Sequence, residues 1–155
     1  MKKTYSILMI TIMVTAFVAC KKDKNNNDPK NDLKSTWELA EYGTSWMPNQ
    51  TYEPGNGNLL RFNDDTFIKY DKDKVLEQGK YTTAPDNTVE ESVCETNLKD
   101  TYTRRIDFTY DDSTRVYFKT FYYIADNKLY LISGCNVNDG RVKAVYRRAN
   151  PIPID

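Results

Sequence analysis

Apolar and polar residues alternate with a period of two along most of the chain after residue 32. Trp37 and Leu39 flank Glu38, and the same alternation recurs at residues 60–62, 106–110, 129–131 and 142–146. Successive side chains of a β-strand point to opposite faces of the sheet, so this pattern predicts half-buried strands. No window shows a stripe of helical period. The chain is therefore expected to be all-β.

Short polar clusters separate the alternating runs. They lie at residues 63–65, 71–73, 85–87, 111–113, 126–127 and 139–140 and are rich in Asp, Asn and Gly. These residue types tolerate the positive φ angles of tight hairpins. Short connections join antiparallel neighbours, so eight or nine strands should form a meander. Closing into a barrel would remove the exposed edges of such a sheet, and an antiparallel barrel is the predicted fold of residues 33–155.

The first nineteen residues have a different character. Lys2 and Lys3 precede an uncharged, mostly apolar stretch at residues 5–18, and Ala19 and Cys20 follow it. This stretch is shorter than the roughly 20 apolar residues that span a membrane. It fits a secretory signal peptide with a small residue before the cleavage site. Residues 1–19 are expected to be removed.

The segment Phe17-Val18-Ala19-Cys20 resembles the lipobox of bacterial lipoproteins. The resemblance implies that the Cys20 thiol receives a diacylglycerol and that the new amino terminus is acylated. Several acyl chains together anchor a protein stably to a membrane. Lys21 stands where an Asp would favour the inner membrane, which points to the outer membrane of a Gram-negative bacterium. The alternative is an ordinary signal peptide with an incidental cysteine. The periplasmic and the surface face both remain open.

Residues 20–32 are expected to form a flexible tether. Beyond Cys20 they are almost entirely Lys, Asp and Asn, with one Pro, and nothing in them can be buried. Such sequence stays extended and mobile. The whole chain carries 22 basic and 22 acidic side chains. This balance gives no electrostatic reason to expect nucleic-acid binding.

The barrel domain resembles the lipocalins, and more closely the small lipocalin-like lipoproteins of Gram-negative bacteria. Ser35-Thr36-Trp37 is similar to the Gly-x-Trp start of lipocalins, and Arg147-Arg148 to the arginine that packs on that tryptophan. Residues 60–62 and 79–81 match L-x-F and G-x-Y elements. The resemblance implies an eight-stranded barrel that holds a small ligand. It also implies a contact between Trp37 and Arg147 that closes one end.

The cysteine and histidine content limits the chemistry. Cys94 and Cys135 remain after cleavage, and in an oxidising compartment such a pair is expected to form a disulfide. A nucleophilic thiol or a metal pair would need partners, and the chain contains no histidine. Ser-His-Asp and Cys-His catalysis are thereby excluded. Paired acids such as Asp64-Asp65 and Asp111-Asp112 lie where hairpins turn. No enzyme activity, cofactor or metal is expected.

Two segments are candidates for binding. The long connection at residues 43–58 contains Trp46 and Tyr52, and long loops are often functional. The resemblance to lipocalins, whose first loop folds across the open end of the barrel, implies that these two residues form a lid. The alternative is that Trp46 simply covers the barrel end as part of the core. The run at residues 115–124 is apolar on both faces. One face must be interior. The other contains Tyr117, Phe121 and Tyr123, and it is either an exposed aromatic ladder or covered by the tether or a loop.

Two functions follow from these observations. The first is a lipid-anchored binding barrel that captures a small hydrophobic or amphipathic molecule. The alternative is a solid-cored, membrane-tethered subunit that binds a protein or glycan through Tyr117, Phe121 and Tyr123. The first rests mainly on analogy of fold.

Replacing Cys20 with Ser tests the anchor. Cys20→Ser should abolish the mass added by acylation and move the protein from the membrane fraction to the soluble fraction, because the acyl chains supply the membrane affinity. Mass spectrometry and membrane fractionation measure both effects. Unchanged association of the variant with membranes would contradict the anchor.

Overall fold

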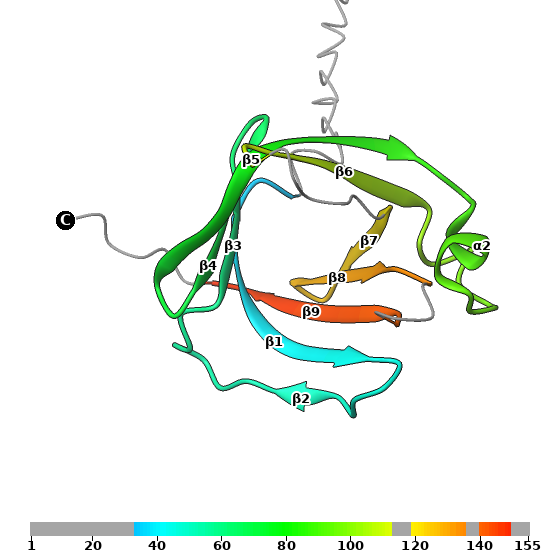
Figure 1. The fold of residues 1–155 in the computed structure, drawn as a ribbon, viewed down its shortest axis with the longest axis horizontal. Helices are drawn as coiled ribbons and strands as arrows, with labels where there is room; N and C mark the ends of the chain where they lie inside the picture. The colour runs from blue at the N-terminus through cyan, green and yellow to red at the C-terminus, as the bar shows by residue number, and fades with distance from the viewer. Residues whose placement is uncertain (1–32, 113–118, 136–139, 150–155) are drawn as a thin grey trace, which may run out of the picture.

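The computed structural model describes residues 33–112, 119–135 and 140–149. Within them, eight antiparallel strands form a closed barrel and one further short strand joins it (Figure 1). The elements in chain order are β1 (Thr36–Thr44), β2 (Gln50–Thr51), β3 (Leu59–Phe62), β4 (Thr66–Asp71), β5 (Lys74–Pro85), α2 (Val89–Val93), β6 (Arg104–Tyr110), β7 (Thr120–Ala125), β8 (Lys128–Ser133) and β9 (Val142–Arg148). The predicted meander of eight or nine strands is confirmed.

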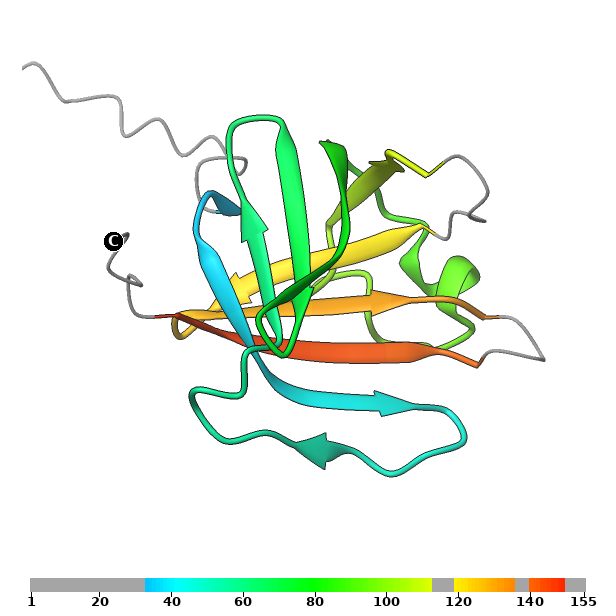
Figure 2. The same cartoon turned by 60° about the vertical axis from the view of Figure 1, so that its left-hand side comes forward.

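The first strand closes the barrel and changes partner along one edge. Along the edge that closes the barrel, β1 pairs with β9 from Trp37 to Thr44. Along the other it pairs with β3 at residues 36–38 and with β2 at Glu41 and Tyr42. The register with β9 shifts between Leu39 and Glu41, as at a β-bulge, where strands bend. Figure 2 shows β1 curving at this point, with β2 beside it on the outside of the barrel.

Tight turns join several strands as the sequence predicts. Lys72 and Asp73 link β4 to β5 with φ of 48° and 66°, and Asp126 and Asn127 link β7 to β8 with φ of 51° and 57°. Two consecutive residues with positive φ are typical of type I′ hairpins, whose twist matches that of the flanking strands. The interpretation of residues 71–73 as a turn is confirmed.

One end of the barrel is filled around Trp37. Its ring is fully buried, and its Nε1 donates a hydrogen bond to the Leu33 carbonyl oxygen at 2.8 Å. Arg148, not Arg147, covers the indole, with its guanidinium carbon 4.8 Å from the ring centroid. The prediction that Arg147 packs on Trp37 was wrong, because the strand register places Arg148 opposite Trp37. Arg147 lies opposite Glu38 and faces outward.

A second apolar cluster lies outside the barrel wall, beneath α2. It contains fully buried Phe121 and Ile132, together with Val89 and Val93 of the helix. Tyr123 stacks on Tyr130, with ring centroids 4.4 Å apart. The prediction of an exposed aromatic ladder is therefore wrong for Phe121. The alternative, in which a loop segment covers this face, is confirmed for that residue. Tyr117 lies outside the described residues.

The segment that covers this cluster is fixed to the sheet at both ends. Cys94 and Cys135 form the predicted disulfide, with Cα atoms 5.3 Å apart. Next to it, the Glu95 carboxylate forms an ion pair with Arg141 at 2.6 Å and accepts a hydrogen bond from Lys143 at 3.1 Å. A disulfide that closes a loop of this length contributes about 3–4 kcal/mol in the chain-entropy model. The helix and its loop are thus held on the outer face of β7 to β9.

Asp86 fixes the beginning of the same segment. Its carboxylate accepts hydrogen bonds from the backbone and side chain of Thr88, from Arg105 at 2.8 Å and from Lys119 at 3.3 Å. Burial alone would raise the pKa of Asp86. The hydrogen bonds from Thr88, Arg105 and Lys119 outweigh burial and hold the pKa well below its usual range.

Truncating Phe121 tests this arrangement. Phe121→Ala should lower the free energy of unfolding by about 3–5 kcal/mol, because it leaves a cavity beneath α2. Leu76→Ala, at a side chain that is half exposed, is the control and should change it by less than about 1 kcal/mol. Denaturant unfolding measures both variants. Equal effects would show that the face is not core.

Candidate functional site: a pocket in the open half of the barrel

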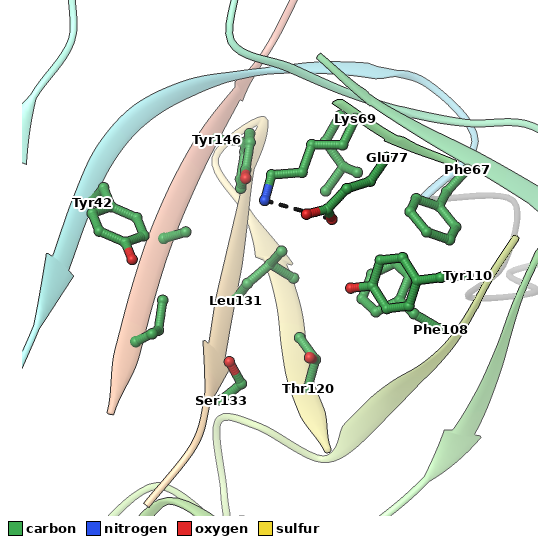
Figure 3. Close-up of a pocket in the computed structure, with 13 residues that line it drawn as sticks. Tyr42, Phe67, Lys69, Glu77, Phe108, Tyr110, Thr120, Leu131, Ser133 and Tyr146 are labelled. Atoms are coloured by element: carbon green, nitrogen blue, oxygen red, sulfur yellow. Dashed lines mark ion pairs between the residues drawn. The ribbon is translucent and has the colours of Figure 1, made fainter. Parts of the chain in front are cut away.

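The interior is not filled at the end opposite Trp37. A pocket of about 140 Å³ lies there, lined by side chains from every strand of the closed barrel (Figure 3). Its lining residues are Tyr42, Leu60, Phe67, Lys69, Glu77, Phe108, Tyr110, Thr120, Leu131, Ser133, Val142, Ala144 and Tyr146. We call it the interior pocket.

Differences in side-chain size create this pocket. Phe67 and Phe108 pack edge to face with centroids 4.7 Å apart and form one wall. Gly79 on β5 lies directly opposite Phe67, and a Cβ at this position would clash with the carbonyl oxygen of Thr109 on β6. The opposite wall contains the small side chains of Ser133 and Ala144. Large rings on one wall and small side chains on the other leave a gap that neither wall fills.

The interior pocket contains one ion pair. Lys69 on β4 lies directly opposite Glu77 on β5, and Lys69 Nζ is 3.8 Å from Glu77 Oε2. Figure 3 shows the two side chains pointing toward each other beside Tyr146. The Lys69 side chain is 41% exposed and that of Glu77 only 11%. The Glu77 side chain is therefore largely buried, whereas part of the Lys69 side chain reaches solvent.

The Lys69–Glu77 pair is not among the residues predicted from the sequence, although the pattern contained a signal for it. Lys69 is two residues after Phe67, so the two side chains are expected on the same face of their strand. On the next strand, Glu77, Gly79 and Tyr81 are spaced by two residues and are likewise expected on one face. A charged residue at an interior position of each of two neighbouring strands indicates a polar feature inside the barrel. The wall beside the pair is also irregular, since the register shifts between Lys69 and Tyr70.

Tyrosines supply the other polar groups of the interior pocket. Tyr42, Tyr110 and Tyr146 all line it. Burial raises the pKa of Tyr146 above its ordinary value, and the nearby Glu77 carboxylate raises it further. The Tyr146 hydroxyl therefore stays protonated and neutral at physiological pH. Neutral hydroxyls can both donate and accept hydrogen bonds to a ligand.

The candidate lid does not lie over the interior pocket. The segment at residues 43–58 runs along the outside of β1, because the Glu38 carboxylate accepts hydrogen bonds from the backbone of Gly55 at 2.7 Å and Asn56 at 3.1 Å. Trp46 is 70% exposed and lies beside Gly140. Tyr52 lines a different, outer pocket. The two residues therefore do not form one lid.

The remaining predicted site residues lie elsewhere. Phe121 and Tyr123 belong to the cluster beneath α2 and do not line the interior pocket. Cys20 and Tyr117 lie outside the described residues. Within residues 33–112, 119–135 and 140–149, no group of three or more Cys, Asp and Glu side chains could hold a metal ion. The same residues contain no helix long and apolar enough to cross a membrane.

Comparison of the chain with models of protein families, with curated proteins and with solved structures finds no match.

Alkaline titration tests the burial of Tyr146. A tyrosine in the unfolded chain ionises near pH 10, whereas Tyr146 ionises later when folded. The unfolded state therefore loses its proton first, and stability should fall as the pH rises above about 10. Tyr146→Phe should make this fall shallower in unfolding experiments between about pH 9 and 11. A fall as steep as that of the unmodified protein would contradict the burial of this hydroxyl.

Proposed function

We propose that the protein is a lipid-anchored, non-enzymatic binding protein whose barrel captures a small amphipathic molecule at the outer membrane. The observation that carries the proposal is the interior pocket, where aromatic rings surround one ion pair and several tyrosine hydroxyls. Ligand sites are commonly mostly apolar, with a few polar groups that fix orientation. The closed eight-stranded barrel is compatible with the lipocalin-like resemblance.

The volume of the interior pocket limits what it can hold. At about 140 Å³ it is smaller than the roughly 300–1,000 Å³ of sites for drug-sized ligands. It is close to the engineered cavity of about 150 Å³ that binds benzene. The part of a ligand that enters is therefore a single ring or a short branched chain. A hydroxyl or similar group on it would meet the Lys69–Glu77 pair or a tyrosine.

The anchor is proposed from the sequence. Acylation of Cys20 would hold the chain at the membrane, and residues 21–32 would link it to the first buried residue of the barrel, Leu33. Lys21 after the cysteine supports the outer membrane. The alternative function, a solid-cored subunit that binds through Tyr117, Phe121 and Tyr123, has less support. Phe121 is buried, and the barrel interior is partly open.

Filling the interior pocket tests the proposal. Ala144 lines the pocket, whereas the next residue, Val145, does not. We expect the full chain to bind phenol, used as a probe of suitable size. Ala144→Met should weaken this binding at least tenfold while preserving thermal stability, because the added methylenes occupy empty space. Nuclear magnetic resonance titration measures the affinity.

Val145→Met is the matched control, since it adds a similar side chain on the outer face of the same strand. It should leave phenol affinity unchanged. Absence of phenol binding to the unmodified protein, or equal binding by Ala144→Met, would overturn the proposed function.

A further inference from the structure

A second and larger pocket lies in the barrel wall, outside the interior pocket. Its volume is about 420 Å³, and we call it the outer pocket. It shares three lining residues, Tyr42, Lys69 and Tyr146, with the interior pocket. Tyr52 and Leu76 line the outer pocket and not the interior pocket. The two pockets therefore meet at the same three side chains.

The change of partner along β1 produces this opening. β1 pairs with β3 only at residues 36–38, and beyond the bulge it pairs with β2. Asn58 bridges the divergence, since its carbonyl oxygen accepts a hydrogen bond from Leu39 N at 2.9 Å. The neighbouring Gly57 carbonyl accepts one from Asp73 N at 2.9 Å. The rim is thus built from hydrogen-bonded backbone of β1 and of the turn between β4 and β5.

Charge is distributed unevenly between the two pockets. Of the two pockets, Glu77 lines only the interior one, where its carboxylate is paired with the Lys69 ammonium group. The outer pocket is lined by Lys69, whose ammonium group is paired with Glu77, and by Lys72 and Asp71. The Lys72 side chain is exposed at the rim. An anionic group inside would lie beside the Glu77 carboxylate, whereas at the rim it can approach the exposed Lys72 ammonium group.

We propose that the outer pocket is a second subsite that binds the anionic end of an elongated amphipathic ligand. The apolar end of the same molecule occupies the interior pocket, and its linking atoms pass between Tyr42, Lys69 and Tyr146. Tyr52 and Leu76 contact the linking chain, and Lys72 attracts the anionic group. The ligand class is thus a monoanion with a small apolar end, such as an aryl-substituted carboxylate. This inference rests on the proposed function of the interior pocket.

A matched series of probes tests the second subsite. The series comprises phenylalkanoates with two to six methylenes, together with the corresponding alcohols and amines, and each is titrated into the full chain by calorimetry. One chain length should be optimal. At that length the carboxylate should bind about two- to fivefold more tightly than the alcohol, as expected for one exposed charge contact, and the amine more weakly. The preference for the carboxylate should decrease at high salt.

Substitution of the rim lysine separates this inference from the proposed function. Lys72→Gln should reduce affinity for the best carboxylate to that of the alcohol and leave phenol binding unchanged. Lys80→Gln removes an exposed lysine that lines neither pocket, so it should change neither.

Phenol binding without any preference for the carboxylate would overturn the second subsite and leave the proposed function intact. Equal carboxylate binding by Lys72→Gln and by Lys80→Gln would do the same. Tighter binding of the amine would overturn the anionic ligand class. Failure of phenol and of every probe to bind would overturn the proposed function and this inference together.

Discussion

The architecture depends on the pairing of β1 with β9, which turns a meander into a closed barrel. Without it, β1 and β9 would both present unpaired edges, which are sites of aggregation. The same strand also limits the closure, because its other edge passes from β3 to β2. The wall opens where that change occurs, and the outer pocket lies there. Closure and opening are thus two consequences of how one strand is paired.

The two ends of the barrel differ in the way their interior is used. Around Trp37 the space is filled by apolar side chains, and Arg148 covers the indole. At the other end, interior positions of β4 and β5 hold Lys69 and Glu77. A partly buried ion pair adds little stability, because desolvation offsets much of the attraction. A barrel selected only for stability would be expected to hold apolar side chains there. This placement of charge supports the proposed binding function.

Much of the fold could be predicted from local pattern, because the alternation of side chains and the residues of tight turns are local properties. The arginine partner of Trp37 could not be. Arg147 and Arg148 are adjacent in sequence, and only the register with β1 decides which one faces inward. α2 was missed because its five residues are too few to show a helical stripe. Phe121 lies on a strand that is apolar on both faces, so the pattern alone could not show which face α2 covers.

The candidate site was less predictable than the fold. The interior pocket depends on which large and small side chains face each other across the barrel, and strand pairing brings together residues as distant as Tyr42 and Ala144. The position of the segment at residues 43–58 could not be predicted from the sequence either. The Glu38 carboxylate holds it on the outer face of β1, and a resemblance to lipocalin loops does not report that contact.

The central claim is that the barrel has an interior pocket at the end opposite Trp37 and that a small ligand can enter it. A crystal structure of the protein under xenon pressure tests it most directly, because xenon enters apolar cavities of about this size. The account predicts a strong xenon peak inside the barrel, between Phe108, Leu131 and Ala144. A structure without that peak, in which these side chains meet and fill the space, would contradict the account.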